Sequence, residues 1–202
     1  MRKVVVSLLL WLLPLGALAG PQLKAPVWHE GQSWKVEAVY PRVTGGWSKP
    51  VLWVFEVVGA EDGRYLIEVR CGGELRARLY FERAPLCLRR VELFDRIRGK
   101  MVVRGEEFQG AVPAFPRHSP VPYHFPSFSD SGGGTFGDLH QEVTAVVEVP
   151  EEVRGLVEGA EGEGMTVVVR RGEKEVFRQL WFPSFPWAVW TEAGGIRAWL
   201  RP

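Results

Sequence analysis

Residues Val51 to Arg104 constrain the fold of this chain more than any other stretch, because they alternate short apolar segments with turn residues. The segments read VLWVFEVV, RYLIEVRC, LRARLYF, LCLRRVELF and GKMVV. In the second segment Tyr65, Ile67, Val69 and Cys71 share one face. They alternate with Arg64, Leu66, Glu68 and Arg70 on the other face. Side chains of a strand point to opposite faces in turn, so this period of two predicts a sheet with one apolar face. The stretch therefore predicts an antiparallel meander.

The rest of the chain continues the same pattern. Further strands are expected at Ser33–Tyr40, Gln141–Val149, Met165–Arg170, Glu173–Trp181 and Ile196–Leu200. Asp-Gly and Gly-Gly pairs supply the turns, and no long helical period follows residue 20, although 151–164 is compatible with a short helical turn. We expect one all-β domain over residues 20–202, built as a single curved antiparallel sheet of about nine to ten strands that forms a half-barrel or a barrel.

Two segments of the meander carry more specific expectations. Residues 51–58 are apolar at both parities, which is typical of a central strand covered on both faces. In residues 86–93 the apolar parity shifts across Arg89 and Arg90, as one extra residue in a ladder would cause. The shift predicts a β-bulge near Arg89–Arg90, and such a bulge curls a sheet.

Residues 106–140 interrupt the strand pattern. Five prolines alternate here with aromatic residues, and Ser131 is followed by three glycines. Because proline cannot donate a ladder hydrogen bond, this segment is expected to be a long irregular loop inserted between strands.

The first nineteen residues have the features of a secretory signal peptide. Arg2 and Lys3 precede an apolar run too short to span a bilayer, and Ala17-Leu18-Ala19 forms a small-x-small cleavage site. An uncleaved anchor is the alternative, but Pro14 and Gly16 disfavour it. A lipid anchor would need a cysteine where Gly20 stands. We therefore expect an exported protein, periplasmic or extracellular, that is soluble after cleavage.

Charge and composition exclude some partners. Without Arg2 and Lys3 the chain has 23 basic and 24 acidic residues, a net charge of −1, and this balance gives no indication of a nucleic acid or anionic membrane partner. Arginine outnumbers lysine, cysteine and methionine are scarce, and asparagine is absent, which indicates a thermophilic source or a GC-rich genome.

An exported protein with two cysteines invites a Cys71–Cys87 disulfide. The expected topology opposes it, because the two residues would lie at opposite ends of the strand between them. That strand separates them by roughly 20 Å, whereas a disulfide needs Cα atoms within about 7 Å. We favour unpaired thiols, with Cys71 buried.

Residues for catalysis or metal binding are present without the spacing that either needs. The four histidines, His29, His118, His124 and His140, show no tight ligand pattern, and no Gly-x-Ser-x-Gly elbow occurs. The carboxylate pairs lie at expected turns, and the glycine run after Ser131 lacks the lysine of a phosphate loop. We expect no enzyme, no cofactor and no metal. A histidine–carboxylate pair, His124 with Asp130 or Glu142, would argue otherwise.

Aromatic residues are the remaining signal. Seven of them lie in the proline-rich loop or near the C-terminus and are the candidate binding residues: Phe115, Tyr123, Phe125, Phe128, Phe185, Trp187 and Trp190. They could form a binding surface, or they could roof the open side of a curved sheet that has no helix to cover it. We favour the roof.

Gly31-Gln32-Ser33-Trp34 looks like the Gly-x-x-Trp start of a first strand in many exported β proteins, and it resembles the Gly-x-Trp of lipocalins with one residue added. A curved antiparallel sheet after a signal peptide is similar in outline to the periplasmic lipoprotein carriers. That resemblance covers architecture and no diagnostic motif, and it implies a half-barrel that holds acyl chains.

Three functional hypotheses follow. The first is a non-enzymatic envelope protein that binds an apolar ligand or lipid on a concave β face. The second is an interaction module of an envelope or surface assembly, which would use an exposed aromatic patch to bind another envelope protein. The third is carbohydrate binding, which needs at least two exposed and roughly coplanar indoles.

Overall fold

The computed structural model describes residues 22–60, 62–106, 121–128 and 133–202. They form twelve strands and one short helix, α1 (Glu151–Val157). The strands are β1 (Ser33–Val39), β2 (Val51–Gly59), β3 (Arg64–Cys71), β4 (Glu74–Arg83), β5 (Leu86–Asp95), β6 (Lys100–Glu106), β7 (Gly134–Phe136), β8 (Leu139–Ala145), β9 (Met165–Arg171), β10 (Lys174–Trp181), β11 (Trp190–Ala193) and β12 (Ile196–Arg201).

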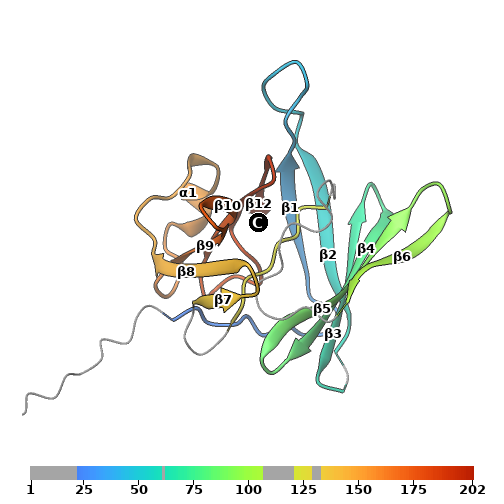
Figure 1. Ribbon diagram of the computed structural model, residues 1–202, viewed down its shortest axis with the longest axis horizontal. Helices are drawn as coiled ribbons and strands as arrows, with labels where there is room; N and C mark the ends of the chain where they lie inside the picture. The colour runs from blue at the N-terminus through green and yellow to red at the C-terminus, as the bar shows by residue number, and fades with distance from the viewer. Residues whose placement is uncertain (1–21, 61, 107–120, 129–132) are drawn as a thin grey trace, which may run out of the picture.

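All twelve strands belong to one antiparallel sheet that does not close on itself. The strand order is β6-β5-β4-β3-β2-β1-β12-β11-β10-β9-β8-β7, so two six-stranded meanders meet where β1 pairs with β12. Figure 1 shows β3–β6 as a wing on the right, β7–β10 on the left, and the segment 121–128 (yellow) passing between them. The expectation of a curved, open antiparallel sheet is confirmed, with more strands than the nine or ten predicted.

One face of the sheet carries the core. The inward residues alternate along each strand, as in Trp53, Phe55 and Val57 of β2, which are at most 4 % exposed. The sheet bends around this inner face with the help of register shifts in the β2–β3, β3–β4, β4–β5, β5–β6 and β9–β10 pairs. In the β4–β5 pair Tyr80 faces Arg90 and Phe81 faces Leu88, which leaves Arg89 as the extra residue. The predicted bulge is confirmed.

Three details differ from the sequence-based expectations. Strand β2 was expected to be covered on both faces, but Leu52 on its outer face is 44 % exposed. The expectation was wrong because apolar residues at outward positions were interpreted as buried. Strands β7 and β11 were missed because they are only three and four residues long. The expected loop 106–140 accordingly contains β7 and the first two residues of β8, while 121–128 is irregular as predicted. The short helical turn after Pro150 is confirmed as α1.

Within the described residues, no helix is long and apolar enough to cross a bilayer. The expected signal peptide, residues 1–19, lies outside the part of the chain that the structure describes.

Both cysteines are free, and they lie at opposite ends of β4 as the topology predicted: Cys71 pairs with Glu74 and Cys87 with Glu82. The prediction that Cys71 is buried is wrong, because it lies next to the β3–β4 turn, where it is half-buried. Cys87 is the buried thiol. It faces outward, where Glu82 and Arg89 cover it, and its Sγ lies 3.7 Å from Glu82 Oε2.

Thiol labelling is expected to separate the two cysteines. Burial raises the pKa of the Cys87 thiol, and the thiolate is the reactive form, so Cys71 should react with iodoacetamide at least about tenfold faster. Peptide mass mapping of the folded protein after brief labelling measures this, with a Cys71→Ser variant as the control. Equal labelling of both positions would contradict the burial of Cys87.

Candidate functional site

The concave face of the sheet is lined by aromatic rings, and Trp187 lies at their centre. Its ring centroid is 5.1 Å from that of Phe55, 5.5 Å from Trp34 and 5.6 Å from Phe125. Trp28 also stacks on Trp187, and its Nε1 donates a hydrogen bond of 2.7 Å to the carbonyl oxygen of Pro186. The rings therefore join three segments outside the strand ladder to the sheet: the N-terminal segment with Trp28, the segment with Phe125 and the segment with Trp187. We call residues 121–128 the first strap and residues 182–189, which connect β10 to β11, the second strap.

The structure brings together four of the seven candidate binding residues in this interior. Tyr123, Phe125 and Phe128 of the first strap and Trp187 of the second are at most 8 % exposed. Phe185 is half-buried and packs edge-on against Phe182. Trp190 begins β11 and belongs to the outer face, opposite Leu180 and Trp199. Phe115 lies outside the described residues. The straps thus have the position that the favoured roof interpretation gave them.

The first strap is held by two glutamines that point inward from the sheet. Gln141 of β8 accepts a hydrogen bond from the Ser127 backbone N–H through Oε1 and donates one to the Ser127 carbonyl oxygen through Nε2, both 2.8 Å long. Gln179 of β10 donates through Nε2 to the His124 carbonyl oxygen at 2.8 Å. Both side chains are at most 1 % exposed. A side-chain amide thus takes the place that a neighbouring strand would take in a ladder.

The sequence analysis did not single out either glutamine. The available signal was their parity: Gln141 shares a face with the inward Leu139 and Val143, and Gln179 lies between the inward Phe177 and Trp181. A polar residue at an inward position of a strand must find a partner. What that partner is cannot be deduced from strand parity, because the strap comes from a separate part of the chain.

His124 in the first strap is a buried titratable group. Its ring stacks on Tyr123 and packs against Phe177, and neither ring nitrogen has a hydrogen-bond partner among the described residues. Burial lowers the pKa of His124 to about 4, with no compensating charge nearby. The imidazole is therefore neutral at pH 7, and its protonation would place an unpaired charge inside the core.

A surface groove of about 540 Å³ opens on one end of the interior. The buried side chains of Leu23, Met165 and Trp181 lie in its wall, and Lys24, Glu161 and Glu163 lie around it. Trp181 continues inward, with ring centroids 5.3 Å from Phe128 and 6.1 Å from Trp187. We call this groove the mouth, because Trp181 both lines the groove and belongs to the aromatic interior.

Glycine shapes one side of the mouth. A Cβ built on Gly164 would lie 2.5 Å from the Phe182 ring, and one on Gly162 would lie 3.1 Å from the Pro183 ring. Any larger residue at position 164 would have to displace Phe182. The second strap therefore packs directly on the backbone of the loop before β9.

A second groove, of about 600 Å³, lies on the outer face of β8–β12. Val168, Leu180 and Trp190 contribute buried apolar side chains, and the indole N–H of Trp190 has no hydrogen-bond partner in the described part of the chain. Val147 and Glu148 of the β8–α1 connection and Glu152 of α1 form its other wall. We call this the outer groove.

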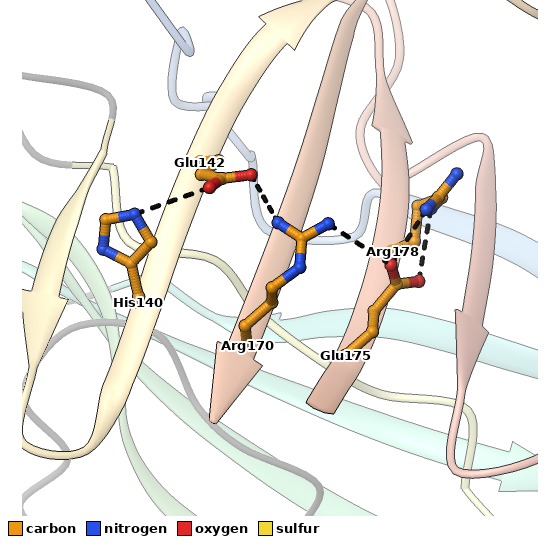
Figure 2. Close-up of polar contacts among 5 residues, drawn as sticks. All are labelled: His140, Glu142, Arg170, Glu175 and Arg178. Atoms are coloured by element: carbon orange, nitrogen blue, oxygen red, sulfur yellow. Dashed lines mark hydrogen bonds and ion pairs between the residues drawn. The ribbon is translucent and has the colours of Figure 1, made fainter. Parts of the chain in front are cut away.

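An ion-pair ladder crosses the outer face beside the outer groove. Figure 2 shows His140 and Arg170 on either side of Glu142, and Glu175 between Arg170 and Arg178. The Arg178 guanidinium holds Glu175 by two hydrogen bonds of 2.9 and 3.2 Å. These side chains are a third to a half exposed, so the ladder contributes little to stability. It gives the outer groove a polar wall.

The histidine–carboxylate pair that would indicate an enzyme does not form with Glu142. His124 lies in the interior, whereas Glu142 lies on the outer face, held by Arg170 and His140. Asp130 is outside the described residues. No cluster of three or more potential metal ligands occurs among the residues that the structure describes.

The fold and site define an open, curled antiparallel β protein whose concave face is covered by irregular straps. Comparison with known proteins finds no family model, no curated protein and no solved structure that matches this chain.

Proposed function

We propose that this chain is an exported, non-enzymatic binding protein whose ligand is an apolar chain, such as the acyl chain of a lipid, bound on the concave face of the sheet. One observation supports the proposal: straps outside the strand ladder cover the aromatic interior, and Trp181, in the wall of the mouth, packs on the rings of that interior. Apolar pockets with few polar groups are what small apolar ligands occupy. Export rests on the N-terminal sequence alone.

The straps are the part of the fold that an entering ligand would displace. Side-chain hydrogen bonds from Gln141 and Gln179 hold the first strap to the sheet, and its aromatic rings pack on the core. An apolar ligand that enters at the mouth would replace strap rings on the concave face, so ring contacts are exchanged rather than lost. In this proposal the straps protect the apolar face from water when no ligand is bound.

Filling the mouth tests the proposal. Ser184 is exposed at the tip of the second strap, where the Phe185 N–H donates to the Phe182 carbonyl oxygen and so closes a turn. A Ser184→Trp side chain would occupy the mouth without touching the core. The probe is the fluorescent fatty acid cis-parinaric acid, and the variant is expected to weaken its binding at least about tenfold, an effect near 1.4 kcal/mol.

The matched control is Thr44→Trp, which adds the same ring to the exposed β1–β2 connection far from the mouth. It should bind the probe like the wild type. Failure of the wild type to bind the fatty acid, or equal binding by Ser184→Trp, would contradict ligand entry at the mouth.

A second candidate function is supported by the outer groove. Its apolar floor, the unpartnered Trp190 indole N–H, and the carboxylates Glu148 and Glu152, which form no ion pair in the described residues, suit a segment of a partner protein. In this second function Trp190 is a binding residue, and the aromatic interior is only the hydrophobic core of the fold. Carbohydrate binding is not carried further, because it needs two exposed indoles and, in the described part of the chain, Trp47 alone reaches even 38 % exposure.

A further inference from the structure

The charges of this nearly neutral chain are separated in space. Residues 64–106, which span β3 to β6, contain eleven basic and six acidic residues, a net charge of +5. Residues 148–163, which include α1, contain six glutamates and one arginine, a net charge of −5. In Figure 1 the wing and α1 lie on opposite sides of the molecule. The net charge of −1 that remains without Arg2 and Lys3 is therefore an average over a basic wing and an acidic segment.

The β5–β6 turn at the end of this wing presents an apolar side chain among basic ones. Ile97 is 99 % exposed, and Arg96, Arg98 and Lys100 flank it in the sequence. In the described residues, Arg96 and Lys100 form no ion pair. An isoleucine so fully exposed has no structural role in the core, whose nearest member along the strand is Leu93.

The turn is held in one conformation rather than left loose. Asp95 Oδ1 accepts hydrogen bonds from the backbone N–H groups of Ile97 and Arg98, at 3.0 and 3.1 Å. Gly99 adopts a φ of 64°, and its N–H donates to the Asp95 carbonyl oxygen at 2.8 Å. This arrangement fixes Ile97 at the outermost point of the turn.

The outer face of the same hairpin continues the apolar surface. The register pairs Phe94 with Met101 and Glu92 with Val103, so Phe94, Met101 and Val103 share one face. Phe94 and Val103 are 37 % and 38 % exposed. Lys100 pairs with Asp95 on the other face of the hairpin, and Arg104 contacts Asp95 at 3.4 Å. We call Phe94, Ile97, Val103 and the basic residues Arg96 and Arg98 of the turn the wing tip.

We propose that the wing tip docks the protein on an anionic lipid surface. Apolar side chains that project from a basic surface insert into the headgroup region of a membrane, while the basic side chains pair with lipid phosphates. Charge complementarity selects this occupant, because the acidic segment 148–163 on the other side orients the wing toward a negative surface. The inference goes beyond the proposed function and does not depend on what the concave face binds.

Vesicle sedimentation tests the proposal. The protein is prepared from Gly20 onward, since the apolar run in residues 4–13 would bind vesicles by itself. It should sediment with phosphatidylcholine vesicles that contain about 30 mol % phosphatidylglycerol and not with pure phosphatidylcholine, and about 0.5 M salt should release it.

Three variants assign the contact. Arg96→Gln with Arg98→Gln should weaken vesicle binding at least about tenfold, and Ile97→Ser should weaken it severalfold. Val43→Ser, at a fully exposed valine of the β1–β2 connection that follows Arg42, is the matched control and should bind like the wild type. Because all these side chains are exposed, thermal unfolding should not change.

Three results would overturn the proposal. The first is no binding of the wild type to anionic vesicles at low salt. The second is equal loss of binding in Val43→Ser. The third is unchanged vesicle binding by Ile97→Ser together with equally tight binding to heparin, which would make the wing tip a general polyanion site rather than a lipid-docking surface. None of these results bears on fatty acid binding at the mouth.

Discussion

Replacing Gln141 with leucine is expected to lower the free energy of unfolding by about 2–4 kcal/mol, because it leaves two buried backbone groups without partners. Gln141 is the side chain that satisfies both the N–H and the carbonyl oxygen of Ser127, and it is 1 % exposed. Leucine has a similar volume and cannot bond to either group. The loss should therefore come from the strap contact and not from a cavity.

Two measurements check this. Urea unfolding gives the change in free energy, and amide hydrogen exchange at Ser127 reports the strap itself, which should exchange much faster in the variant. Thr144→Leu, an exposed position on the same strand, is the control and should change stability by no more than about 0.5 kcal/mol. A loss in Gln141→Leu as small as that of the control would show that the amide does not hold the strap.

Acidification is expected to destabilise the protein through His124. The pKa of His124 is about 4 in the folded state, below the value near 6.5 of an unfolded chain. The unfolded state therefore binds the proton more tightly, so the contribution of neutral His124 is complete above about pH 6.5 and is lost as the pH falls toward 4. The full loss is about 3 kcal/mol.

The variant His124→Phe isolates this effect. It keeps an aromatic ring between Tyr123 and Phe177 and removes the titration, so its stability should stay nearly constant between pH 6.5 and 4.5. His140→Phe, at a histidine that is half-exposed and outside the core, is the control for the substitution itself. The pKa values of Glu82 and Asp95 are lowered by their hydrogen bonds, to Arg89 and to the Arg98 backbone, so they titrate below this window. Identical slopes in wild type and His124→Phe would contradict the buried neutral imidazole.

The sequence predicts the sheet well because parity is a local signal. The alternation of Tyr65, Ile67 and Val69, and the break at Arg89–Arg90, each depend on a few adjacent residues, and both appear in the structure as expected. Leu52 shows the limit of this signal, because an apolar residue at an outward position looks the same in sequence whether or not another layer covers it. Short strands such as β11 carry too few residues to show a period.

The site was predicted less completely because its contacts join distant parts of the chain. The aromatic residues of the straps stand out in the sequence, and four of them do meet in one cluster. Which sheet residues hold the first strap could not be predicted, since Gln141 and Ser127 are brought together only when the sheet curls. The basic wing tip was missed for a different reason: net charge averages over the wing and the acidic α1 region, and only the fold separates them.

The central claim is that the concave aromatic face, beneath its straps, holds an apolar ligand. Native mass spectrometry of the mature protein, purified from the cells that make it and followed by solvent extraction, tests it most directly. The account predicts a stoichiometric lipid or other apolar molecule that the extraction releases. A bare polypeptide mass, with no fatty acid taken up on addition, would contradict it and leave the outer groove at Trp190 as the site to pursue.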